Sequence, residues 1–74
     1  MSTVANEVKS MALEGGLASK IIRDYWRNNP SLSYRERLAT GKLIQSVINN
    51  ARYQLGMDEV ELEVTMRRVV LGDI

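Results

Sequence analysis

The chain has 74 residues and a formal net charge of +1, and it contains no cysteine and no histidine. A chain of this length forms one domain, residues 1–74, around a small apolar core. The missing residue types exclude disulfides, remove the usual nitrogen and sulfur ligands of structural zinc, and leave a serine or threonine nucleophile without its common base. We therefore expect a protein that is not an enzyme and holds no metal or cofactor.

The charges are unevenly distributed along the chain. Residues 20–52 hold seven Lys or Arg and two acidic residues, whereas residues 53–74 hold two Arg and five acidic residues. A basic middle and an acidic tail favour an oriented partner surface over binding to any polyanion. No apolar run approaches the about 20 residues of a transmembrane helix, and the N-terminus lacks the pattern of a secretory signal. These features predict a cytoplasmic protein with no membrane partner.

The first predicted helix lies within residues 1–16, where apolar residues recur at helical spacing: Val4, Val8, Met11 and Ala12. Ser2 or Thr3 can cap its start, and Gly15-Gly16 can end it. A helix of about 12 residues is marginal by itself in water. This segment therefore either docks on the rest of the domain or stays frayed until a partner orders it.

The second predicted helix begins at Leu17 and carries pairs of apolar residues at every fourth position, the last of which is Tyr25-Trp26. It ends at Asn28-Asn29-Pro30, because the residue before a proline is disfavoured in a helix. We expect Trp26 to belong to the core, since large aromatic side chains dominate small cores. The alternative is a binding hot spot flanked by arginines.

A third helix is predicted to start at Ser33-Tyr34-Arg35-Glu36, which has the form of a capping box. Its predicted apolar face consists of Leu38, Ile44, Val47, Ile48, Ala51 and Leu55. Gly56 follows as a candidate C-terminal cap. Thr40-Gly41-Lys42 falls inside this segment, where a glycine costs about 1 kcal/mol relative to alanine. Either the helix tolerates the glycine or the chain turns there.

A turn at Thr40-Gly41-Lys42 would make residues 33–55 a helix-turn-helix, with residues 43–55 as the recognition helix. Side chains suited to base edges and phosphates then mark a DNA-binding surface: Lys42, Gln45, Ser46, Asn49 and Arg52. The register is imperfect, because Arg37 occupies a position that usually holds a small apolar residue. The competing interpretation is one long amphipathic helix with a polar outer face.

The segment from Asp58 to Leu71 is ambiguous between helix and strand. Asp58 can cap a helix, but polar and apolar residues alternate from Glu59 to Met66, which is strand periodicity. In a helix the apolar residues fall on two opposite faces, with Val60, Val64 and Leu71 on one and Leu62, Met66 and Val69 on the other. Such a helix needs cover on both sides, whereas a strand needs a partner edge. We expect a helix.

The predicted fold is all-α, a small bundle of three to four short helices with the C-terminal element open between helix and strand. We expect it to act by binding a macromolecule. The leading hypothesis is a prokaryotic or phage-type regulator that binds RNA polymerase or another component of the bacterial transcription machinery. The predicted docking residues flank the Pro30 turn and are Arg23, Arg27, Arg35 and Arg37.

Two other functions compete with protein binding. One is a helix-turn-helix DNA-binding repressor, although a net charge of +1 and an acidic tail are poorly suited to many phosphate contacts. The other is an antitoxin-like or assembly protein that forms a homodimer through residues 59–66, where the strand periodicity lies.

Overall fold

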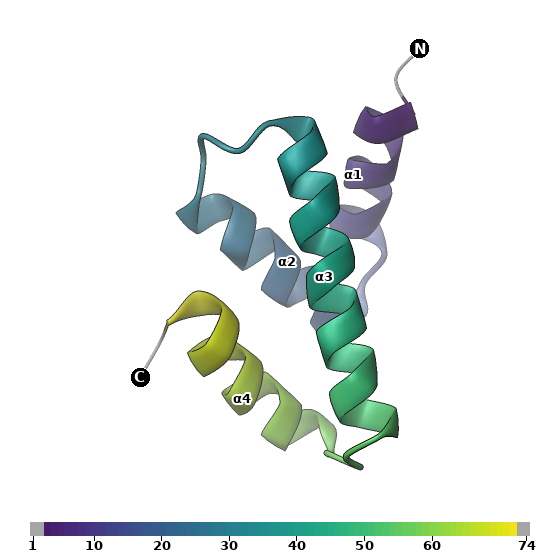
Figure 1. Cartoon of the computed structure of the whole chain (residues 1–74), viewed down its shortest axis with the longest axis vertical. Helices are drawn as coiled ribbons and strands as arrows, with labels where there is room; N and C mark the ends of the chain where they lie inside the picture. Colours follow the sequence, from purple (N-terminus) through teal and green to yellow (C-terminus); the bar gives the residue numbers. More distant parts are fainter. Residues whose placement is uncertain (1–2, 73–74) are drawn as a thin grey trace.

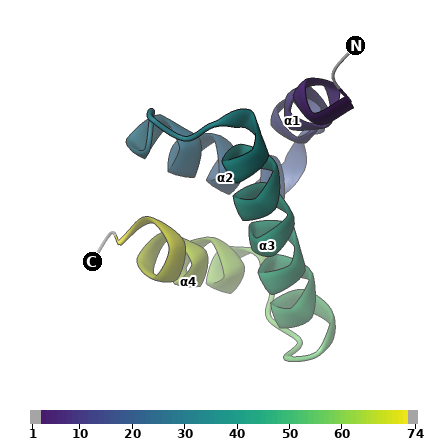
Figure 2. The ribbon, with the colours of Figure 1, turned by 45° about the horizontal axis from the view of Figure 1, so that its top comes forward.

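The computed structural model describes residues 3–72, which form four α-helices and no strand: α1 (Thr3–Leu13), α2 (Gly16–Asn28), α3 (Tyr34–Tyr53) and α4 (Glu59–Leu71). The other three helices all contact α3, which is the longest (Figure 1). α2 also contacts α1 and α4, whereas α1 and α4 lie on opposite sides of α3 and do not touch within the described residues (Figure 2). The predicted all-α bundle is confirmed, and residues 59–71 are helical.

α1 packs on the rest of the bundle. Of the two alternatives expected for this segment, docking and fraying, the structure shows docking. Val8 and Met11 are buried, and the Ser19 hydroxyl donates to the Met11 carbonyl at 2.6 Å. The Arg23 guanidinium donates to the Ala12 carbonyl at 2.6 Å. These two side chains satisfy carbonyls that the end of a helix otherwise leaves without partners. The predicted cap at Ser2 lies outside the described residues.

The connection between α2 and α3 follows the predicted signals. α2 ends at Asn28, and the Asn29 side-chain amide donates to the Tyr25 carbonyl at 2.8 Å. The Ser33 hydroxyl accepts from the Glu36 amide at 3.2 Å, while the Glu36 carboxylate accepts from the Ser33 amide at 2.9 Å. The capping box at the start of α3 is therefore confirmed.

α3 continues without interruption through Thr40-Gly41-Lys42. Of the two alternatives for this segment, the single long helix that tolerates the glycine is confirmed, and the turn that would divide residues 33–55 into two helices is wrong. Gly41 is buried because α1 and α2 approach α3 closely there, and the Trp26 indole donates to the Thr40 hydroxyl at 3.2 Å. The glycine that favours a turn locally serves here to let helices pack closely. α3 ends at Tyr53, close to its predicted end, and Gly56 has a positive φ of 67°.

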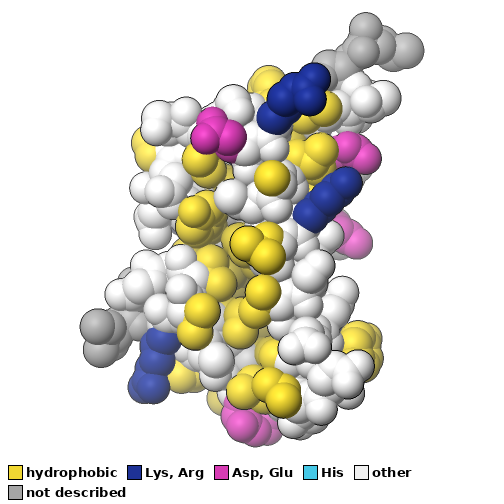
Figure 3. All heavy atoms as spheres, viewed as in Figure 1, with side chains coloured by type: hydrophobic (Ala, Val, Ile, Leu, Met, Phe, Trp, Pro, Cys, Tyr) yellow, Lys and Arg dark blue, Asp and Glu magenta, His cyan; other side chains and the backbone are white. Residues whose placement is uncertain are grey.

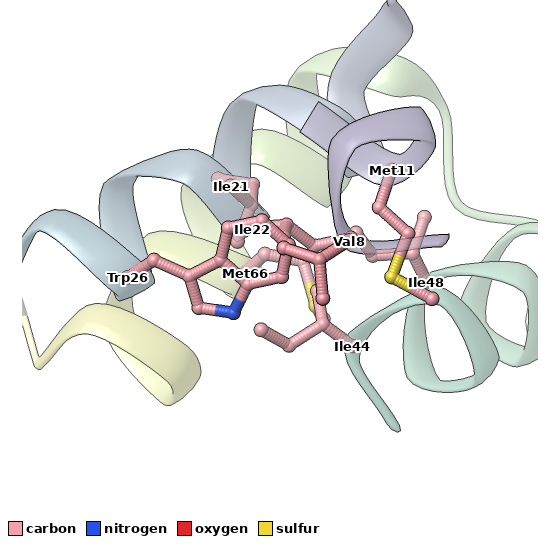
Figure 4. Close-up of a cluster of buried hydrophobic side chains, with 8 residues drawn as sticks. All are labelled: Val8, Met11, Ile21, Ile22, Trp26, Ile44, Ile48 and Met66. Carbon is pink, nitrogen blue, oxygen red and sulfur yellow. The ribbon is translucent and has the colours of Figure 1, made fainter. Parts of the chain in front are cut away.

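The core is formed by side chains from all four helices (Figure 4). Its main cluster contains Val8, Met11, Ile21, Ile22, Trp26, Ile44, Ile48 and Met66. Trp26 is 7% exposed, which confirms the interpretation of Trp26 as a core residue. Ile48, at the middle of the predicted apolar face of α3, is fully buried.

α4 is covered on one side only. The Asp58 carboxylate caps its start by accepting from the Glu61 amide at 2.9 Å, and Leu62 and Met66 are buried. Val60 is 74% exposed and Val64 49%, so the expectation that both apolar faces are covered is wrong for this chain. No helix within residues 3–72 has the length and apolar character that crossing a membrane requires.

Candidate partner-binding surfaces

The arginines around the Pro30 turn have different neighbours. Arg23 is tied to the end of α1, and Arg27 pairs with Asp24 at 3.1 Å while its side chain stays 74% exposed. Arg35 is exposed. Arg37 is half-buried, its guanidinium carbon lies 5.9 Å from the centre of the Tyr34 ring, and its Nε is buried without a hydrogen-bond partner. Arg27 and Arg35 are therefore the two predicted docking residues that remain both exposed and free of a helix-capping role.

The predicted DNA-binding residues of α3 are spaced three or four residues apart and so share one broad side of the helix, but their surroundings differ. Lys42 and Ser46 are exposed, whereas Gln45, Asn49 and Arg52 line a cavity of about 300 Å³ beside the start of α2. Arg52 pairs with Glu59 at 2.8 Å, and the hydrogen bond that its guanidinium donates to the Glu59 carboxylate raises the pKa of Arg52. Of these five residues only Lys42 and Arg52 are cations, and Glu59 balances the charge of Arg52, so they do not form an extended basic surface.

The cavity beside α2 is polar. It includes Gly15 and Gly16 at the N-terminus of α2, where no side chain caps the helix. Free amides at a helix start can accept an anion, and Arg52 adds a cation to the lining. Because Glu59 already balances the charge of Arg52, the cavity offers an anion little beyond the helix end.

A second cavity is an apolar groove of about 340 Å³ between α2, α3 and α4. Its lining consists of Tyr25, Thr40, Leu43, Ile44, Val47, Val69 and Val70. Ile44 is buried and Tyr25 half-buried, so they form the deeper part. Two of the lining residues are largely exposed: Leu43 on α3, at 63%, and Val69 on α4, at 70%. Figure 3 shows hydrophobic side chains gathered over α3 and α4 on this side of the molecule.

Ion pairs join α2 to α4, the helix that forms one wall of this groove, and hold α4 in place. Lys20 pairs with Glu63 at 3.1 Å, and Arg67 pairs with both Asp24 and Glu63 at 3.2 Å. The hydrogen bond from Lys20, followed by that from Arg67, lowers the pKa of Glu63. The hydrogen bond to Glu63 is also the main reason that the pKa of Arg67 is raised. Two of the five acidic residues of the tail, Glu59 and Glu63, are therefore paired with the basic middle of the same chain.

Comparison with family models, curated proteins and solved structures finds no match to this chain. The candidate surfaces therefore rest on their own geometry. The sequence-based hypotheses did not identify the groove, and Leu43 was absent from the predicted apolar face. One feature of the sequence could have indicated the groove. Leu43 and Val47 are four residues apart, so they share a side of α3 that lies next to its buried side.

Proposed function

We propose that this protein is a non-enzymatic regulator that binds another protein through the apolar groove. The observation that carries the proposal is the exposure of Leu43 and Val69 beside a groove of about 340 Å³. Monomeric soluble proteins rarely expose contiguous apolar patches larger than a few hundred Å² unless the patch binds something. A groove between helices suits the apolar face of an amphipathic helix from the partner, which would bury its own aliphatic side chains there.

Protein binding fits these observations better than DNA binding does. The groove presents Leu43, Val47 and Val69, side chains that gain free energy by leaving water and offer nothing to phosphates. α3 is one continuous helix, and Arg52 is paired with Glu59. A DNA interface depends on several free cations arranged along one surface, and α3 offers few.

The hypothesis about the partner's identity comes from the sequence. A small, basic-middled chain without catalytic residues suits a prokaryotic or phage-type regulator of transcription, acting in the cytoplasm on RNA polymerase or an associated protein. Arg27 and Arg35 then serve to steer an acidic partner surface towards the groove, an effect that salt weakens.

The test is capture of partners from a bacterial lysate with the wild-type chain and with Leu43→Asp and Val69→Asp variants. Each substitution places a carboxylate beside the groove at an exposed position, so the fold should persist while the captured protein is lost. Leu13→Asp is the matched control, because Leu13 is 82% exposed at the end of α1 and outside the groove lining. Helical circular dichroism confirms that each variant is folded.

The same capture, repeated with nuclease, separates protein from DNA binding. A partner that survives nuclease and disappears with both groove variants supports the proposal, and immunodetection of RNA polymerase subunits tests the transcription hypothesis. The double variant Arg27→Glu with Arg35→Glu should slow association and reduce its salt dependence. Undiminished capture by the groove variants, or capture that nuclease abolishes, would contradict binding through the groove.

A further inference from the structure

The outward side of α4 carries apolar side chains that nothing in the chain covers. Val60 is 74% and Val64 49% exposed, and they lie one turn apart on the same side of the helix. Leu71 continues this side and is half-buried. Leu62 and Met66, which enter the core, lie on a different side of α4, as does Val69 beside the groove. The exposed side is therefore a surface separate from the groove.

Two opposite charges lie along one edge of this apolar side and have no ion-pair partner among residues 3–72. They are Glu61 and Arg68, both exposed. The other three charged residues of α4 already have ion-pair partners. Glu59 pairs with Arg52, and Glu63 and Arg67 pair with residues of α2. The unpaired charges of α4 are thus one acid near its start and one base near its end.

The spacing of these two residues makes the surface complementary to itself. Seven residues are two helical turns, so Glu61 and Arg68 lie on nearly the same side of α4, about 10 Å apart along the axis. Val64 lies close to their midpoint. A second α4 laid antiparallel, with a two-fold axis near Val64, brings each Glu61 to the Arg68 of the other copy. A parallel copy would instead place equal charges side by side.

We propose that the protein forms a homodimer through antiparallel packing of α4 on α4. The valines supply the apolar contact and the two Glu61 to Arg68 pairs fix the direction of the helices. α4 is only about 20 Å long, so the contact is smaller than the about 1,600 Å² of a standard interface and the dimer dissociates on dilution. Val69 stays outside the contact. Each dimer therefore presents two open grooves, which strengthens binding to a partner with repeated sites.

Sedimentation equilibrium over a wide range of protein concentration tests this proposal. The apparent mass should rise from 8.4 kDa towards twice that value for the wild type. Glu61→Arg alone makes both inter-chain contacts positive, and Arg68→Glu alone makes both negative, so each variant should associate about tenfold more weakly or worse. An equimolar mixture of the two variants restores opposite charges at both contacts and should form a mixed dimer, which differently tagged chains reveal.

Two controls separate loss of the dimer from loss of the fold. The variants should keep wild-type helical content when diluted, and Lys9→Glu, on α1 away from α4, should leave the wild-type association unchanged. The proposal is overturned if the wild type remains at 8.4 kDa throughout, if the single reversals associate as the wild type does, or if the mixture forms no mixed dimer. Association that Leu43→Asp abolishes and the α4 reversals leave intact would assign self-contact to the groove instead.

Discussion

Gly41 lies where three helices meet, and the absence of a side chain is what allows them to do so. A β-carbon at this position would stand 2.5 Å from Met11 Sδ and 3.2 Å from Trp26 Cζ2. Alanine would raise helix propensity by about 1 kcal/mol but would overpack the core at a cost of about 1–3 kcal/mol. Since the two effects partly cancel, we expect Gly41→Ala to lower the free energy of unfolding by up to about 2 kcal/mol in denaturant titration.

Ser46→Ala is the control for Gly41→Ala, since Ser46 is exposed on the same helix and gains propensity without meeting a neighbour. Its free energy of unfolding should rise by a few tenths of a kcal/mol. A Gly41→Ala variant as stable as the wild type would mean that the flexible Met11 side chain moves aside without loss of packing.

Ile48 has no exposed surface and lies in the C-terminal half of α3, on its buried face. Removing most of its side chain leaves a cavity, so Ile48→Ala should cost about 2–5 kcal/mol, a large share of the about 5–15 kcal/mol available to a small domain. Leu43→Ala, at a position 63% exposed, should change the free energy of unfolding by about 0.5 kcal/mol or less. If Leu43→Ala lost as much free energy of unfolding as Ile48→Ala, measured by thermal or denaturant unfolding, the groove wall would be part of the core.

At the scale of single elements, the helix ends follow from local chemistry and could be predicted. The Ser33 capping box, the Asp58 cap and the stop before Pro30 each act within a few residues of the chain. The uninterrupted course of α3 could not be predicted in the same way. Gly41 favours a turn locally, and only the packing of Met11 and Trp26, distant in sequence, explains it within a helix.

The same limit applies to α4 and the groove. Periodicity shows that Val60 and Leu62 lie on different sides of α4, but which side is covered depends on where α2 and α3 lie. The alternation that suggested a strand is the pattern of a helix with one buried and one exposed apolar side. Leu43 and Val69 line one groove only because α2, α3 and α4 pack against one another, an arrangement of the whole bundle.

At the scale of the whole molecule, the basic middle and the acidic tail bind each other. Lys20 and Arg67 join α2 to α4 through Glu63 and Asp24, and Arg52 joins α3 to α4 through Glu59. The charge polarity that suggested an external acidic partner is thus partly used within the chain. What remains for a partner is the apolar groove, with the exposed Arg27 and Arg35 elsewhere on the surface.

This internal pairing predicts that acid loosens α4. Hydrogen bonds from Lys20 and Arg67 lower the pKa of Glu63 below its ordinary value of 4.5, and the Ser33 backbone and side chain lower that of Glu36. A carboxyl with a lower pKa in the folded state stabilises the fold at pH values above 4.5, and this stabilisation disappears as pH falls through the folded pKa. The melting temperature should therefore be steady near neutrality and fall in acid below that range.

Glu63→Gln isolates the contribution of the α2–α4 pairs to this behaviour. The variant should melt at a lower temperature than the wild type at neutral pH, because Lys20 and Arg67 lose a charged partner. Its melting temperature should then fall less on acidification, so the two curves converge below the folded pKa of Glu63. Glu7→Gln removes an exposed glutamate of α1, a helix that does not contact α4, and serves as the control. Parallel curves for Glu63→Gln and the wild type would mean that other carboxylates cause the acid loss, and that the Lys20 and Arg67 pairs do not hold α4 in place.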